Sequence, residues 1–197
     1  EGIAPVQLDE IDALIGQGAK AMIRKAFELR GVTGDHSAGA DRLWPNFIAF
    51  YANHIAEESR PYDGVEAALD RLRDAGASLA VCTNKTQALS ERLLDALGLQ
   101  SRFSIIVGAD AVPARKPDPG HYLAALGGAG GHLRHVLIGD SQTDAQTAQN
   151  AGAPFVFWPH GYGPEPKNGV RVDAILQEFA SLPEVLASTI FEDQSGT

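Results

Sequence analysis

Three features of the sequence predict an α/β fold with a doubly wound parallel sheet and a small helical domain attached to it. Short apolar segments recur from residue 61 onward, and helical patterns alternate with them. Such segments are typical of parallel strands that helices cover on both faces. Residues 1–60 show helical spacing instead. We therefore predict a helical domain at residues 1–60 and an α/β core at residues 61–197.

The helices of the first domain are predicted from apolar residues spaced three or four positions apart. They centre on three groups: Leu8, Ile11 and Ile15; Met22, Ile23, Ala26 and Phe27; and Leu43, Phe47, Phe50, Tyr51 and His54. A polar, glycine-containing segment at residues 31–39 separates the second and third groups.

The core is predicted to contain four strands, at residues 78–82, 103–107, 136–139 and 154–158. Helices are expected between and after them, at residues 65–76, 89–97, 121–126 and 143–151. Gly76 and Gly98 mark two of the helix ends, because glycine is a common helix stop.

Composition limits the classes of function. The single cysteine, Cys82, excludes an internal disulfide and favours a reducing compartment, the cytoplasm. The net charge of −9 argues against nucleic acid as a partner, since an acidic surface repels a phosphate backbone. No apolar run reaches the ~18 residues of a membrane span, and the first residues lack the pattern of a signal peptide.

The residues that follow the strands are the candidate site, because ligands of such sheets bind beyond the carboxyl ends of the strands. Thr83-Asn84-Lys85 follows the first strand and precedes a helix. A hydroxyl and backbone N–H groups at a helix N-terminus can hold phosphate. Thr83 could instead cap that helix.

Two further segments carry charged candidates. Lys116 lies in a proline-fixed turn, where a lysine can meet a phosphoryl group as a point charge or remain a surface residue. Asp140 and Asp144 flank the turn after the third strand. Magnesium in proteins usually takes one or two carboxylates together with water and substrate phosphate. Helix capping by Ser141 or Asp144 is the alternative.

In order, spacing and placement, these motifs resemble the haloacid dehalogenase superfamily, and within it the phosphoglycolate phosphatase-like branch. The matching segments are residues 59–65, 83–85, 116–119 and 139–144, and residues 15–19 resemble part of that branch's helical cap. The resemblance covers essentially the whole chain. It implies that residues 1–60 form a cap that closes over the site and excludes water.

The resemblance also implies an activity: a magnesium-dependent phosphatase that hydrolyses a small phosphorylated metabolite, such as 2-phosphoglycolate, through an aspartyl-phosphate. Thr83 and the backbone of Asn84 would hold the phosphoryl group, and Lys116 would neutralise it and orient the nucleophile. Asp140 would bind Mg²⁺ directly, and Asp144 would support the metal shell or bind through water.

The family's nucleophile motif, Asp-x-Asp-Gly-Thr, is absent. Its first aspartate forms the aspartyl-phosphate and its second is the general acid/base, yet no Asp-x-Asp occurs in the 197 residues. The family places this motif on a central strand, between those at 78–82 and 136–139. A buried sheet without that strand would leave hydrogen bonds unmet. We therefore expect the natural protein to carry about 20–35 further residues. An intact sheet built from these residues alone would contradict that expectation.

Other functions stay open at this point. A chain without a nucleophile could be a non-catalytic module that binds phosphate or a partner protein. Dehalogenases share the fold and the lysine but usually lack the carboxylate pair of Asp140 and Asp144. A phosphonatase would need a cap lysine that forms a Schiff base, for which Lys20 is the candidate. A homodimer is also open, with Phe155, Phe157 and Trp158 as either core or interface residues.

Overall fold

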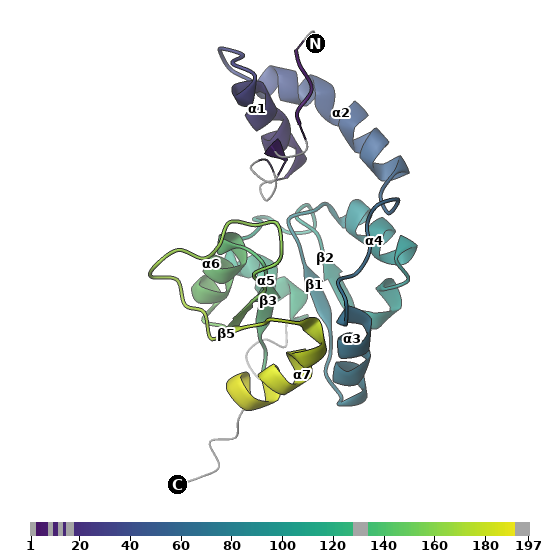
Figure 1. Cartoon of the computed structure of the whole chain (residues 1–197), viewed down its shortest axis with the longest axis vertical. Coiled ribbons are helices and arrows are strands. Elements are labelled where there is room, and N and C mark those ends of the chain that lie inside the picture. The colour runs from purple at the N-terminus through teal and green to yellow at the C-terminus, as the bar shows by residue number, and fades with distance from the viewer. Residues whose placement is uncertain (1–2, 8–9, 12–13, 15–17, 128–133, 192–197) are drawn as a thin grey trace.

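The computed structural model describes residues 3–7, 10–11, 14, 18–127 and 134–191 (Figure 1). Helices α1 (Ala19–Leu29) and α2 (Ser37–Asn53) pack against each other around the buried side chains of Ile23, Phe27 and Ala40. Gly39 permits this contact, because a Cβ there would lie 2.9 Å from the Phe27 ring. Figure 1 shows this helical pair set off from the rest of the chain. The helix predicted at Leu8, Ile11 and Ile15 falls mostly outside the described residues.

The remaining residues alternate strands with helices, as the apolar pattern predicts. In chain order they form α3 (Val65–Asp74), β1 (Ala80–Cys82), α4 (Gln87–Ala96), β2 (Ile105–Val107), α5 (Pro119–Ala125), β3 (Leu137–Gly139), α6 (Gln142–Ala151), β4 (Phe155–Phe157), β5 (Ala174–Ile175) and α7 (Leu182–Val185). Short helical turns lie at Gln100–Arg102, Phe179–Ser181 and Leu186–Ile190. All the strand pairs are parallel. The predicted strands are present but shorter, and β5 and α7 were not predicted.

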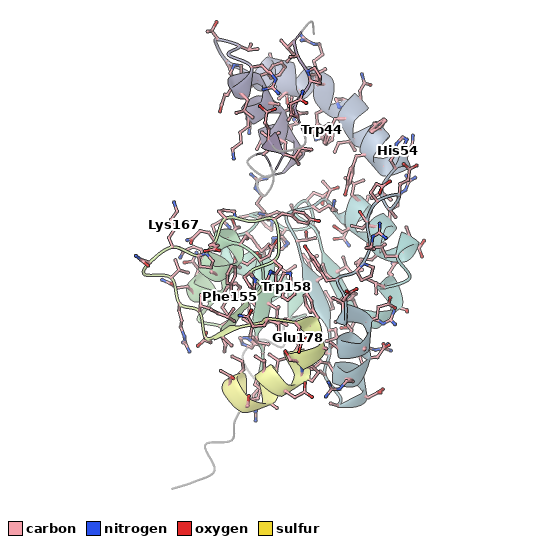
Figure 2. The ribbon with its side chains drawn as sticks, viewed as in Figure 1. Trp44, His54, Phe155, Trp158, Lys167 and Glu178 are labelled. Carbon is pink, nitrogen blue, oxygen red and sulfur yellow. The ribbon has the colours of Figure 1, made fainter. Side chains whose placement is uncertain are left out.

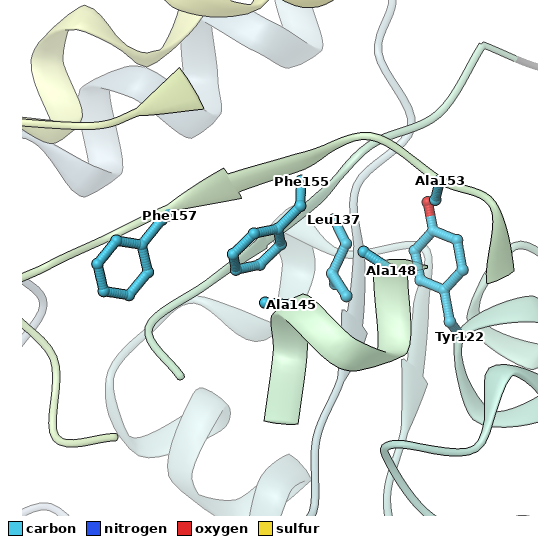
Figure 3. Close-up of a cluster of buried hydrophobic side chains, with 7 residues drawn as sticks. All are labelled: Tyr122, Leu137, Ala145, Ala148, Ala153, Phe155 and Phe157. Carbon is cyan, nitrogen blue, oxygen red and sulfur yellow. The ribbon is translucent and has the colours of Figure 1, made fainter. Parts of the chain in front are cut away.

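Helices cover the sheet of β3, β4 and β5 on both faces, which confirms the doubly wound class. Phe155 and Phe157 lie on one face with side chains of α5 and α6, in the cluster of Figure 3. Val156 and Trp158 lie on the other face with side chains of α3 and α7. The alternation follows the two-residue period of a strand. Residues 155–158 are therefore core residues of this chain.

The strands form two sheets rather than one. One contains β1 and β2, and the other has the order β3-β4-β5. Within the described residues, no strand joins β1 to β3. The parallel α/β class is confirmed, and the described residues do not build the intact sheet that would have contradicted the expectation of a further central strand. Ala80 of β1 is exposed, whereas Phe155–Phe157 of β4 is fully buried.

The backbone hydrogen bonds show which edges are unpaired. Thr83 N donates to Val107 O, and Ser104 N donates to Leu79 O, so these positions face β2. Since hydrogen-bonding direction alternates along a strand, Ala80 and Cys82 direct their backbone groups to the opposite edge. By the same alternation, Ile138 of β3 directs its backbone groups away from β4.

Among the described residues, no helix is long and apolar enough to cross a membrane.

Candidate active site

The three predicted motifs meet at the carboxyl ends of the strands. Lys116 Nζ lies 2.5 Å from Asp144 Oδ1, which joins the segment before α5 to the start of α6. Asn84 Nδ2, from the loop after β1, donates to Lys116 O at 3.1 Å. Residues from three separate segments thus form one connected polar cluster.

The Lys116–Asp144 ion pair is largely removed from water. The two side chains are 11% and 8% exposed. Ser141 Oγ donates to the other carboxylate oxygen of Asp144 at 2.6 Å, and also accepts from Asp144 N at 3.3 Å as the N-cap of α6. The predicted capping by Ser141 therefore coexists with a second role, in which Ser141 holds the carboxylate that holds Lys116.

A buried histidine that sequence reasoning missed fixes the backbone of Lys116. His121 is fully buried; its Nδ1 accepts from Lys116 N at 3.1 Å, and its Nε2 lies 3.0 Å from Val107 O. The carbonyl can only accept, so the ring is neutral with its proton on Nε2. Burial lowers the pKa of His121, which favours this neutral form. In the sequence, the only sign of this role is that His121 lies in the helix that follows Lys116.

Thr83 does not cap the following helix, so the capping interpretation is wrong. The N-cap position of α4 belongs to Thr86, and Thr83 Oγ1 instead accepts from Lys85 N at 3.1 Å, within the loop after β1. Asn84 Oδ1 is buried and accepts no hydrogen bond from the described residues. A buried acceptor without a donor is costly, which suits a loop that a ligand completes.

The loop after β4 encloses Asp140, and the sequence prediction did not include it. Tyr162 N donates to Asp140 Oδ2 at 2.9 Å. Gly161 lies so close that a Cβ there would be 2.2 Å from the same oxygen, and a Cβ at Gly163 would be 2.2 Å from Ser141 Cβ. The two glycines flanking Tyr162 are the signal that could have indicated this close approach.

The oxygen donors fit magnesium in part. Asp140 Oδ1 makes no hydrogen bond to the described residues, so it remains available to a cation. Both oxygens of Asp144 are engaged, by Lys116 and Ser141. Within the described residues no group of three His, Cys, Asp or Glu side chains could hold a metal. Asp140 therefore fits a direct ligand, Asp144 fits a supporting one, and substrate, water or further residues must supply the rest.

Cys82 is close to this cluster but is not a nucleophile. Burial raises the pKa of its thiol to about 11. At neutral pH it is a thiol rather than the reactive thiolate.

A cleft of about 760 Å³ lies between the helical pair and the core. Thr83 and Asn84 form part of its lining, together with residues of α1 and α2. Lys116, Asp140 and Asp144 do not line it, but Asn84 connects it to Lys116. Lys85 Nζ donates across the cleft to Tyr51 Oη of α2 at 2.5 Å.

Comparison with known proteins identifies the family. The sequence model of the Haloacid dehalogenase-like hydrolase family matches residues 1–158. The chain belongs to the haloacid dehalogenase-like hydrolases. Its relatives include a phosphoglycolate phosphatase of Caulobacter vibrioides, 40% identical over 185 residues, with 93% of this chain and 78% of the relative covered. One of Agrobacterium fabrum is 41% identical over 186 residues, with 94% and 79% covered.

Solved structures of this family share the fold. A crystal structure described as a predicted phosphoglycolate phosphatase from Haemophilus somnus superposes with a TM-score of 0.84 at 25% identity, covering 94% of this chain and 85% of that one. CbbY from Rhodobacter sphaeroides, in complex with phosphate, superposes with a TM-score of 0.69 at 26% identity, covering 89% and 80%. The chain is thus a haloacid dehalogenase-like hydrolase of the phosphoglycolate phosphatase-like branch.

Proposed function

We propose that this chain carries the phosphate- and metal-binding half of a magnesium-dependent phosphatase whose substrate is 2-phosphoglycolate or a similarly small phosphorylated acid. The observation that carries the proposal is the buried Lys116–Asp144 pair, linked through Asn84 to the cleft. The family and the names of its phosphoglycolate phosphatase relatives support it. The single cysteine favours the reducing cytoplasm as its place.

Each residue has a distinct proposed role. Thr83 Oγ1 and the backbone N–H of Asn84 bind oxygens of the phosphoryl group. Lys116 neutralises the charge on that group. Asp144 holds the Lys116 ammonium in place through one N–H donor, and the other two donors of the ammonium remain available. Asp140 binds the magnesium ion, which when bound would offset the negative charge of the phosphoryl oxygens.

The helical pair α1–α2 is proposed to act as the cap. It lies across the cleft from Thr83 and Asn84, so its approach to the core would remove water from the phosphoryl group.

The nucleophile is proposed to lie on a strand that pairs with the unpaired edges of β1 and β3. The backbone groups of Ala80, Cys82 and Ile138 point to those edges. An aspartate at the end of such a strand would emerge beside Lys116. Its carboxylate would attack phosphorus, and the P–O ester bond would break as the leaving oxygen takes a proton from the motif's second aspartate and departs as the alcohol. Water would then hydrolyse the aspartyl-phosphate, giving its proton back to that aspartate.

The other activities of the family have less support. The amine of a Schiff-base lysine must be free to meet a carbonyl, but Lys20 Nζ is engaged with Asp41 at 2.6 Å and lies over the Trp44 ring. The carboxylates of Asp140 and Asp144 favour a phosphatase over a dehalogenase, since a dehalogenase needs no metal.

Phosphate release tests the proposal. The full-length protein should liberate phosphate from 2-phosphoglycolate in the presence of Mg²⁺ and stop when the metal is chelated. Lys116→Ala should lower kcat by orders of magnitude, because the phosphoryl charge is then uncompensated. A protein that binds phosphate without any turnover would instead be the non-catalytic module, and wild-type rates for Lys116→Ala would remove the lysine from the mechanism.

A further inference from the structure

The cleft between the helical pair and the core contains cationic side chains that the proposed phosphoryl site does not use. Its charged lining residues are Lys20, Arg24, Lys85 and Arg115, against the single acid Asp110. Lys20 is already paired with Asp41, which lies outside the lining. The whole chain has a net charge of −9. The cleft is thus lined mainly by positive charge although the chain as a whole is negative, which favours an anionic ligand there.

Lys85 is a half-buried cation that has no counter-ion among the residues the structure describes. Its ammonium donates to Tyr51 Oη at 2.5 Å and lies 4.3 Å from the centre of the Tyr51 ring. Among the described residues, no carboxylate pairs with it. The aromatic ring and the hydroxyl offset only part of the cost of removing an ammonium from water. Two N–H donors of Lys85 and the O–H of Tyr51 remain for a ligand.

Arg115 is a second cation without an ion-pair partner in the described part of the chain. It directly precedes Lys116, and its Nη1 would lie 3.3 Å from a Cβ placed on Gly18, so it spans from the core to the helical pair. Asp110 lines the same cleft but forms no ion pair with it; Asp110 Oδ1 accepts from Gln87 N at 2.7 Å at the start of α4.

We propose that Lys85, Tyr51 and Arg115 form an anion subsite that binds the carboxylate of the substrate's leaving group. This inference rests on the proposed function. Lys85 follows Thr83 and Asn84 directly, so the subsite adjoins the proposed phosphoryl site. A carboxylate can accept several hydrogen bonds and suits the guanidinium fork. Because Tyr51 lies on α2 while the two cations lie on the core, a bound carboxylate also ties the helical pair to the core.

The test compares two substrates that differ at the carboxylate. In ethyl phosphate, a methyl group replaces the carboxylate of 2-phosphoglycolate. The wild-type, full-length protein should prefer 2-phosphoglycolate in kcat/KM. Lys85→Met and Arg115→Met should each lower this preference at least about tenfold, since each removes a charge-assisted hydrogen bond. Tyr51→Phe, which removes only a neutral hydroxyl, should lower it less.

Lys167→Met is the matched control. Lys167 is an exposed lysine on the loop after β4, is labelled in Figure 2, and does not line the cleft. Its substitution removes the same charge from the chain, so the substrate preference should not change.

Two results would overturn the subsite. One is a wild-type protein that hydrolyses both phosphates equally well. The other is an unchanged preference in both Lys85→Met and Arg115→Met, which would make the Lys85–Tyr51 bond a cap–core contact only. If the wild type released no phosphate from either compound, the proposed function would fail instead. In that case the dissociation constants of 2-phosphoglycolate and ethyl phosphate would be measured instead. A preference for 2-phosphoglycolate in binding that falls in Lys85→Met and Arg115→Met would support the subsite, and an unchanged preference would overturn it.

Discussion

Breaking the Lys116–Asp144 pair should destabilise the protein measurably. Asp144→Asn keeps the shape of the side chain but leaves the ammonium buried without its counter-charge. At 2.5 Å, the attraction between the charges is about 7 kcal/mol with an effective dielectric constant of 20, before desolvation is subtracted. Losing one partner of such a pair typically costs about 3–5 kcal/mol. For a chain of this length, that corresponds to a fall in Tm of about 6–20 °C.

The assay is thermal unfolding monitored by circular dichroism. Lys116→Met, Asp144→Asn and the variant with both substitutions form a double-mutant cycle with the wild type. The double variant removes both charges and should regain much of the stability lost in Asp144→Asn, with a coupling energy of about 2 kcal/mol or more. Asp41→Asn is the control: it breaks the Lys20–Asp41 pair, whose side chains are 48% and 63% exposed, and Tm should change little. If the losses of stability in Asp144→Asn and Lys116→Met simply added in the double variant, the two side chains would not interact and the buried ion pair would be refuted.

Two further predictions concern the groups around this pair. Gly161→Ala should raise the Mg²⁺ concentration needed for half-maximal activity, because its Cβ would displace the Asp140 carboxylate. If a magnesium titration showed the same requirement as the wild type, the loop after β4 would have no part in metal binding. His121 should make stability depend on pH. Since its pKa is lowered on folding, the unfolded chain takes up the proton first, and stability should fall as pH drops below about 6.5. His121→Asn should show a smaller fall in Tm between pH 7 and 5, and an equal fall would show that other groups are responsible.

Most regular elements of the core were predictable because they have a local sequence signal. The helix at α4 follows from apolar spacing and ends before Gly98, whose φ of 68° lies in the left-handed region. The strand β4 was evident because both of its faces are buried, which demands an unbroken apolar segment. In contrast, β5 spans two residues and Ile175 is exposed, so it leaves no pattern to detect.

The residues of the candidate site were predictable where a short sequence motif marks them. They were not predictable where a contact depends on tertiary packing. Lys116 and Asp144 were both chosen from sequence, and the structure brings them together. The bond between Lys85 and Tyr51 joins residues 34 positions apart and depends on how the helical pair meets the core, which no local spacing encodes. The role of His121 likewise arises only once β2 and the Lys116 segment are adjacent.

The magnesium dependence of Asp140→Asn tests the central claim most directly. Phosphate release from 2-phosphoglycolate would be titrated with Mg²⁺ in the full-length wild type and in the variant. The variant keeps the side-chain shape but loses the charge that binds the cation, so it should release almost no phosphate at a Mg²⁺ concentration that saturates the wild type. Wild-type turnover by Asp140→Asn at ordinary Mg²⁺ would contradict a metal-dependent phosphatase site at this end of the strands.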